Sequence, residues 1–228
     1  MDYKAFEERT GVTFKDSAIL RQAFTHRSYI NENRDTSLSH NERLEFLGDA
    51  VLELVITDFL YKMFPLKNEG DLTSFRSALV NANTLSEVAS TLGMNDHLLL
   101  SKGEAKDTGR ARQYILANTF EAVVGAMYLD GGYECAKAFI EKNVAPLINN
   151  IVDSGLWIDA KSKFQEKAQE VEGVTPLYKT MKESGPDHDK RFEVGVYLGS
   201  TLVEKGLGKS KQEAEQEAAR NALDKFKW

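Results

Sequence analysis

Three acidic residues, Glu42, Glu45 and Asp49, follow one another closely in the segment 40–60, HNERLEFLGDAVLELVITDFL. If the segment is helical, their spacing of i, i+3 and i+7 places all three carboxylates along one stripe. Carboxylates so close together repel and raise each other's pKa, which makes a bare cluster costly. A hard divalent cation removes that cost, because Mg²⁺ binds carboxylate oxygens and keeps several waters. The pattern indicates a candidate Mg²⁺ site.

The rest of this segment is apolar and predicts a helix that buries most of its surface. The side away from the acids carries Leu44, Leu47, Val51 and Leu54. Gly48 is interpreted as a gap in the helix wall through which a substrate backbone approaches the acids.

Two more ordinary interpretations of the acids stay open. Ser39 and Glu42 match a capping box, in which Glu42 ties off the start of the helix. An acidic stripe on an amphipathic helix is also commonly a solvated face. Spacing alone does not decide between these interpretations and a metal site.

A second apolar segment, 114–129, repeats part of the pattern. Asn118 and Glu121 are spaced i, i+3, as Glu42 and Glu45 are. They too could form a capping pair at a helix start. Against this, the apolar pattern already begins upstream at Tyr114.

Composition is that of an ordinary globular protein, with a net charge of −6 over 228 residues. The single cysteine, Cys135, excludes an internal disulfide and fits a reducing compartment. The apolar run after Gly48 is interrupted by Glu53 and Asp58, so no membrane span is expected. The first residues lack the apolar core of a signal peptide. We therefore expect a cytoplasmic protein with no membrane partner.

The acidic excess lies in the first part of the chain. Residues 1–158 carry 16 Lys and Arg against 22 Asp and Glu, whereas residues 159–228 carry 13 of each. Neither part is basic overall, so binding of a nucleic acid would have to depend on local patches.

The stretch NERLEFLGDAVL at 41–52 resembles the defining motif of the ribonuclease III family. Four further segments match in the same order: AFTHRSY (23–29), RSALVNANTLSEVASTLG (76–93), LSKGEAKDTGRAR (100–112) and ILANTFEAVVGAMYLDGGY (115–133). The resemblance is to the short bacterial form of the family and covers essentially the whole chain.

The chain is predicted to fold as two domains. Residues 1–153 read as helical throughout and resemble the all-α ribonuclease III endonuclease domain, with helices that include 114–129 and 133–152 and a mostly exposed loop at 101–112. Residues 159–228 resemble the small α+β double-stranded RNA-binding domain. Its α-β-β-β-α order is predicted as helix 161–171, strands 177–183, 191–198 and 201–207, and helix 210–226, which Ser210 and Glu213 begin as a capping box.

The resemblance implies roles for the acidic residues. Glu45, Asn118 and Glu121 are expected as metal ligands, and Asp49 as a ligand that also organises the attacking water. Asp49 and Glu121 are the expected catalytic residues, and Glu42 is a peripheral ligand or orienter. The family has an aspartate where Asn118 stands, which is the one departure in this set.

RNA contacts are implied in the second domain. Gln165, Glu166 and His188 match positions that contact the minor groove. Lys209 and Lys211 stand at the start of the last helix, where the helix dipole also favours a phosphate. The family usually has a further lysine where Gln212 stands.

The resemblance implies a metal-dependent endoribonuclease that forms a homodimer, each subunit cutting one strand of a double-stranded RNA. Products with 5′-phosphate and 3′-hydroxyl ends, and a role in processing structured rRNA and mRNA precursors, are expected. Mg²⁺ is the expected ion, with Mn²⁺ as a possible substitute. The alternative, motivated by Asn118, is a catalytically weakened ribonuclease III-like protein that only binds double-stranded RNA.

Overall fold

The computed structural model describes residues 3–33, 38–154, 159–186 and 190–228. The chain divides into two compact units, Met1–Trp157 and Ile158–Trp228, and each is described by itself. Unit 1 contains α1 (Lys4–Thr10), α2 (Ser17–Ala23), α3 (Arg27–Asn33), α4 (Glu42–Met63), α5 (Glu69–Val80), α6 (Ala82–Thr91), η1 (Met94–His97), η2 (Glu104–Lys106), α7 (Arg110–Gly131), α8 (Tyr133–Asn143), η3 (Ala145–Leu147) and α9 (Ile148–Ser154). Unit 2 contains α10 (Ala160–Glu172), β1 (Leu177–Ser184), β2 (Arg191–Leu198), β3 (Thr201–Gly208) and α11 (Lys211–Phe226).

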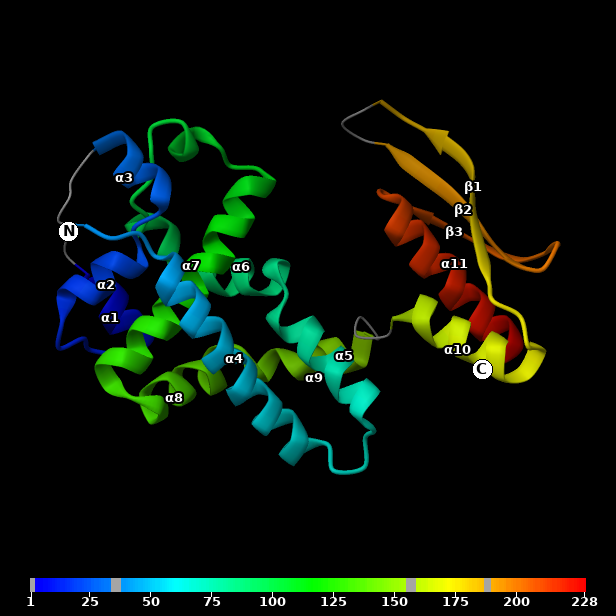
Figure 1. Cartoon of the computed structure of the whole chain (residues 1–228), viewed down its shortest axis with the longest axis horizontal. Coiled ribbons are helices and arrows are strands. Elements are labelled where there is room, and N and C mark those ends of the chain that lie inside the picture. The colour runs from blue at the N-terminus through cyan, green and yellow to red at the C-terminus, as the bar shows by residue number, and fades with distance from the viewer. Residues whose placement is uncertain (1–2, 34–37, 155–158, 187–189) are drawn as a thin grey trace. The chain divides into compact units, whose positions relative to one another are not determined.

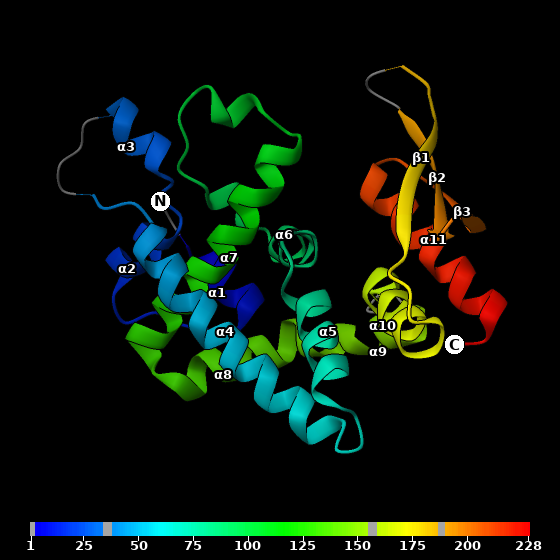
Figure 2. The same ribbon diagram turned by 45° about the vertical axis from the view of Figure 1, so that its right-hand side comes forward.

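Unit 1 is built around two long helices, α4 and α7, which cross one another in both views (Figures 1 and 2). Their apolar side chains form the middle of the core, where Leu52, Ile56, Phe120 and Val123 are fully buried. The apolar side predicted for α4 holds for Leu44 and Val51, which are buried. It is wrong for Leu54, which is 57% exposed, because the core covers only part of the helix surface.

Several helix boundaries follow from local sequence chemistry. Asp16 caps α2 by accepting a hydrogen bond from the Ala18 amide at 2.8 Å, and Asn68 caps α5 in the same way. The predicted loop at 101–112 is too long, because α7 already begins at Arg110. The helix predicted over 133–152, with Pro146 within it or at a bend, is interrupted there: α8 ends at Asn143, because Pro146 has no amide to continue the hydrogen-bond ladder, and α9 follows from Ile148.

Unit 2 is a three-stranded antiparallel sheet of order β1-β2-β3 with two helices. The register runs from Leu177 opposite Tyr197 between β1 and β2, and from Phe192 opposite Gly208 between β2 and β3. In β2, Val194 and Val196 are buried, and their spacing of two residues places both on one face of the sheet. The core consists of small and aromatic side chains from both helices and the sheet: Ala160, Phe164, Val196, Val203, Ala218, Ala219, Ala222 and Leu223.

Candidate functional site

The crossing of α4 and α7 is a contact of backbone against backbone. A Cβ atom on Gly48 would lie 1.7 Å from the carbonyl oxygen of Glu121, and one on Gly125 would lie 2.2 Å from that of Leu44. No side chain larger than hydrogen fits at either position. Gly48 is therefore not an opening for substrate, as its sequence position suggested, but the point at which α7 touches α4.

This contact brings the polar residues of the two helices together. Glu45 and Asp49 flank Gly48 on α4, and Glu121 lies one turn before Gly125 on α7. The side chain of Asn118 is hydrogen-bonded to the Glu45 carboxylate. Four of the residues predicted for the metal site thus meet at one place.

The carboxyls of this group hold their protons more tightly than isolated carboxyls do. Burial, followed by the charges of Asp49 and Glu45, raises the pKa of Glu121 to about 8. Burial and the Glu42 charge also raise the pKa of Glu45, against the lowering effect of its hydrogen bond with Asn118. The pKa of Asp49 is raised by burial and by Glu53. Each ionised acid at this site makes the next ionisation more costly.

Neither capping interpretation holds. Asn118 and Glu121 lie two and three turns inside α7, far from its start at Arg110. The N-cap residue of α4 is Asn41, with no side-chain capping bond, so Ser39 and Glu42 do not form a capping box. The side chain of Asn118 therefore caps no helix and instead interacts with Glu45.

Glu42 lies at the edge of the group and is exposed. Its carboxylate is 3.4 Å from Arg27 Nη1 and 3.7 Å from His40 Nδ1. Its charge contributes to the raised pKa of Glu45, so it belongs to the same electrostatic environment. This placement agrees with a peripheral orienting residue rather than a central ligand.

Sequence reasoning missed Glu53, which it treated only as an interruption of an apolar run. Glu53 raises the pKa of both Asp49 and Glu121, and it lies 3.9 Å from Arg76 of α5. Its spacing of i+4 from Asp49 continues the acidic stripe of α4 by one turn. This spacing would have been enough to add Glu53 to the acidic group from the sequence.

The donor chemistry of this group fits a hard divalent cation. All its donors are carboxylate or amide oxygens, which suit Mg²⁺, Ca²⁺ or Mn²⁺. Burial first, and neighbouring carboxylates after it, raise the pKa of Glu45, Asp49 and Glu121, so their ionised forms are unfavourable here and a cation would stabilise them. Among the residues that the structure describes, no three Asp, Glu, His or Cys side chains are closed around a common point at metal-binding distance. The proposed donor atoms lie on neighbouring faces of α4 and α7, but their side chains do not converge on one point at metal-binding distance.

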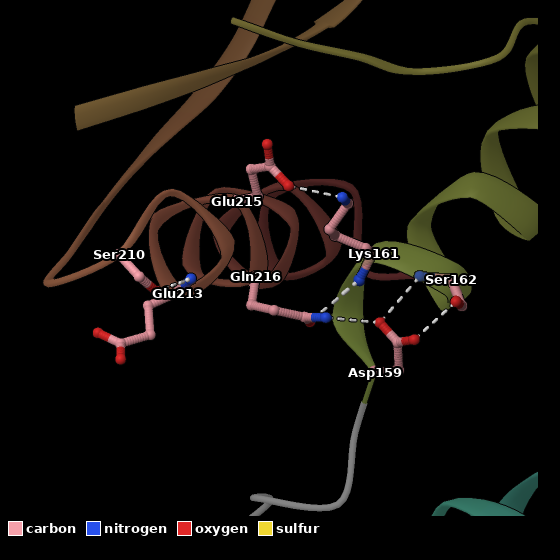
Figure 3. Close-up of polar contacts among 7 residues, drawn as sticks. All are labelled: Asp159, Lys161, Ser162, Ser210, Glu213, Glu215 and Gln216. Atoms are coloured by element: carbon pink, nitrogen blue, oxygen red, sulfur yellow. Dashed lines mark hydrogen bonds and ion pairs between the residues drawn. The ribbon is translucent and has the colours of Figure 1, made fainter. Parts of the chain in front are cut away.

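In unit 2, the start of α10 is fixed to α11 by the contacts drawn in Figure 3. Asp159 Oδ1 accepts hydrogen bonds from Ser162 N and from Gln216 Nε2, the latter at 2.7 Å. Lys161 Nζ lies 2.6 Å from Glu215 Oε2. Burial acts to raise the pKa of Asp159, but the hydrogen bonds that it accepts from Gln216 and Ser162 lower the pKa below its ordinary value. They hold the first turn of α10 in a defined position against α11.

The RNA-binding residues predicted on α10, Gln165 and Glu166, are both exposed on this anchored helix. His188 lies outside the described residues. The structure thus leaves the two α10 residues available to a ligand.

Lys209 and Lys211 are exposed at the start of α11, whose first turn is capped by Ser210 accepting from the Glu213 amide. The half of the predicted capping box that Ser210 makes is confirmed. Lys211 is already engaged, because its Nζ lies 2.8 Å from Glu183 Oε1 and 5.6 Å from the ring centre of Phe192. Lys209 lines a surface hollow of about 530 Å³ together with Lys182 and Arg191. Glu193, Glu213 and Glu217 line the same hollow, so a phosphate at this helix start would meet carboxylates as well as cations, and Lys211 would have to leave Glu183.

No helix within the described ranges is both long and apolar enough to cross a membrane.

Comparisons with known proteins match both units. The family model described as Ribonuclease-III-like matches residues 16–148, and that of the double-stranded RNA binding motif matches residues 160–226. Ribonuclease 3 of Bdellovibrio bacteriovorus is 45% identical over 222 residues, which are 97% of this chain and 94% of the relative. Ribonuclease 3 of Streptococcus gordonii is 46% identical over 218 residues, covering 96% and 94%.

Solved structures also resemble this chain. The nuclease domain of ribonuclease III from Campylobacter jejuni matches with a TM-score of 0.56 and 39% identity, covering 62% of this chain and 98% of that domain. That structure is described as flexible in a region involved in dimer formation.

Proposed function

Because this chain belongs to the ribonuclease III family and is an endoribonuclease of double-stranded RNA, we propose that it cleaves phosphodiester bonds where α4 crosses α7. Glu45, Asn118 and Glu121 are the proposed metal ligands. Asp49 is both a ligand and the residue that orients the attacking water. Glu42, held by Arg27, orients the site from its edge.

The observation that carries this proposal is the Glu121 carboxyl, whose pKa is raised to about 8 by burial and by Asp49 and Glu45. Half-buried acids without a cation among them are a costly arrangement, and such perturbed groups concentrate at functional sites. The family generally uses a divalent metal. We assign Mg²⁺ to this chain, with Mn²⁺ as a substitute.

A bound divalent cation would supply a water that ionises more readily than bulk water and would neutralise charge that develops on the phosphate. The chain's own residues determine how readily the site accepts such an ion. Glu121 must first release its proton, whereas Asn118 offers an oxygen without charge. The hydrogen bond of Asn118 meanwhile holds the Glu45 carboxylate at the site.

The proposed functional unit is a homodimer in which each subunit cuts one strand, leaving 5′-phosphate and 3′-hydroxyl ends with a short overhang. Support comes from large exposed apolar side chains on α4: Phe46 is 82% exposed and Tyr61 is 72% exposed. With Leu54 they fall on one side of the helix by their spacing. A hollow of about 670 Å³ beside Phe46 offers a socket for such a side chain from a second copy. The dimer-forming region named for the Campylobacter nuclease domain also favours this assembly.

Unit 2 is the part of the chain that we propose binds the RNA duplex. Gln165 and Glu166, with His188, are assigned to the minor groove, and Lys209 and Lys211 to phosphates. Recognition of A-form shape requires few base contacts, so little sequence preference is expected. Structured precursors of rRNA and mRNA are the proposed targets.

The test is incubation of the chain with long double-stranded RNA and Mg²⁺, followed by analysis of the product ends. Short duplexes with 5′-phosphates are expected with Mg²⁺ and none with a chelator. Single-stranded RNA of the same sequence is the matched substrate control and should remain intact. Binding of the duplex without cleavage in either Mg²⁺ or Mn²⁺ would overturn the proposal in favour of the weakened RNA-binding protein.

A further inference from the structure

Strand β3 has a neighbouring strand on one side only, since the described sheet has the order β1-β2-β3. The free edge of a strand presents backbone N–H and C=O groups to which another chain can add a strand of its own. Leu207, on this strand, is also 65% exposed, which adds apolar surface beside the edge. An open β3 edge would therefore favour pairing between copies of this chain.

The edge is not open, because α11 side chains bond to the backbone of β3 at alternate residues. The pairs are Lys225 with the Val203 carbonyl, Asn221 with the Lys205 carbonyl, Glu217 with the Leu207 amide and, just past the strand, Glu213 with the Lys209 amide. Three of these hydrogen bonds measure 2.7–2.9 Å. We call the four α11 side chains the edge ladder.

Each side chain of the edge ladder has the polarity that its backbone partner requires. The ammonium of Lys225 and the amide NH₂ of Asn221 donate to carbonyls. The carboxylates of Glu217 and Glu213 accept from amides. Charges that merely faced solvent would have no reason to match the backbone at every position.

The pairing of α11 side chains with the β3 backbone continues along the edge because successive pairs are separated by nearly the same distance on the helix and on the strand. The ladder positions on α11 are four residues apart, about 6.0 Å along a helix. Their partners on the antiparallel strand are two residues apart, about 6.6 Å. The mismatch per step is small enough for flexible side chains to absorb over the three steps between the four pairs.

Two glycines bring the helix close enough for short side chains to reach the strand edge. A Cβ on Gly206 would lie 2.2 Å from Ala218 N, and one on Gly208 would lie 2.5 Å from Ala214 N. The helix therefore rests on the strand backbone itself. At this distance even the short side chain of Asn221 reaches Lys205 O.

We propose that the edge ladder masks β3 and prevents a second copy of this chain from adding a strand at that edge. The occupant that it excludes is the β3 edge of another copy, which has the same length and the same pattern of backbone groups. A ladder that served only to anchor α11 would affect stability but not association.

The test uses the full chain with Glu217→Ala, Asn221→Ala and Lys225→Ala combined, a change that leaves the net charge unaltered. The matched control is Arg220→Ala with Asp224→Ala, two exposed positions on the same helix with the same zero change in net charge. Sedimentation across a range of concentrations compares each variant with the unmodified chain. We expect only the ladder variant to form larger species, at concentrations at least tenfold below those at which the unmodified chain does.

Adding Leu207→Lys to the ladder variant separates masking from anchoring. A lysine beside an edge opposes strand addition but restores none of the lost bonds. We expect the larger species to disappear while the melting temperature stays that of the ladder variant. If the triple variant does not fold, Asn221→Ala with and without Leu207→Lys gives the same comparison. A ladder variant that melts earlier but keeps the association state of the unmodified chain would overturn the proposal.

Discussion

At the crossing of α4 and α7, Gly48 and Gly125 allow two helices to touch, and in unit 2 Gly206 and Gly208 allow α11 to touch β3. The polar groups beside the two contacts differ. Beside the first, acids of one sign face each other and Glu121 has a pKa of about 8. Beside the second, each donor faces an acceptor.

The difference separates packing that serves stability from packing that serves chemistry. A close contact whose neighbouring polar groups are all satisfied needs nothing further. A close contact that gathers like charges is complete only when a ligand of opposite charge binds, and such unrelieved groups are typical of functional sites. Five changes to the molecule test this contrast.

The largest expected effect comes from Asp49→Asn, which removes a carboxylate that no side chain in unit 1 replaces. Cleavage of duplex RNA should fall at least about 100-fold, whereas RNA binding, assigned to unit 2, should be nearly unchanged. Asp58→Asn on the same helix is the matched control, because Asp58 pairs with Lys62 at 2.7 Å outside the site. Cleavage and gel-shift assays decide the matter, and full cleavage by Asp49→Asn would refute the site assignment.

Gly48→Ala tests the contact itself. Its Cβ would lie 1.7 Å from the Glu121 carbonyl, so the helices must separate and the free energy of unfolding should fall by about 3 kcal/mol. Gly70→Ala in α5 is the control, since its Cβ meets only the Asn68 side chain at 3.3 Å. Urea denaturation should show it unchanged or stabilised by up to about 1 kcal/mol. Equal stability of the two variants would mean that the crossing is not tight.

Glu121→Gln tests the cost of gathering the acids. The folded-state pKa of Glu121 is about 8, above the ordinary 4.5, so the unfolded chain ionises first and stability falls as pH rises between these values. In chelator, the variant should match the unmodified chain at pH 4, below the ordinary pKa of 4.5, and exceed its stability by roughly 1–3 kcal/mol at pH 8, allowing for partial exposure. Urea unfolding at both pH values measures this, and parallel pH curves would show that Glu121 titrates normally.

Lys209→Ala with Lys211→Ala should weaken duplex binding about tenfold at low salt and reduce the salt dependence, because phosphate contacts release counterions. The loss should be similar for all duplex sequences. The loss of affinity should also be smaller than for two lysines without ion-pair partners, because Lys211 must break its ion pair with Glu183 before it contacts a phosphate. Lys179→Ala with Lys205→Ala is the control for loss of two charges. If the binding constant of the variant depends on salt as steeply as that of the unmodified chain, Lys209 and Lys211 contact no phosphate and are merely solvated.

The smallest effect is expected from Asn118→Asp. A charged ligand should tighten Mg²⁺ binding and raise cleavage a few-fold at low Mg²⁺, with the gain vanishing as metal saturates. Mn²⁺ should partly rescue the Asn118 form. Mg²⁺ titrations of both forms on one duplex measure this. Because Asn118 lies inside α7 and caps no helix, superimposable curves would exclude it as a ligand.

The acids of α4 were predictable because their spacing alone places them on one helix face. The role of Gly48 was not, because it depends on a second helix that passes over it some 75 residues later in the chain. Periodicity reports which side of a helix is apolar, but Leu54 shows that it does not report how much of that side the fold covers. The short-range capping rule holds at Ser210, which caps α11 as its position predicts, and fails at Ser39 and Glu42, since α4 has no side-chain cap.

In unit 2, the helices, strands and capping serine follow from alternation and helix-start signals. The partner of Lys211 does not, since Glu183 lies 28 positions away and is brought beside it by the sheet. The edge ladder could not be seen either, because its spacing of four residues looks like that of any solvated helix face. Its meaning depends on the step length of a strand against which the helix lies.

Within unit 1, the distance between α4 and α7 and the charge at the candidate site depend on different residues. The distance between the helices is set by Gly48 and Gly125, whereas the charge at the site is set by residues such as Asn118 that do not hold the helices apart. If Asn118 is a metal ligand as proposed, a substitution at position 118 would change metal preference or rate without rebuilding the scaffold. Natural selection can adjust this catalyst one side chain at a time, provided that the two glycines stay in place.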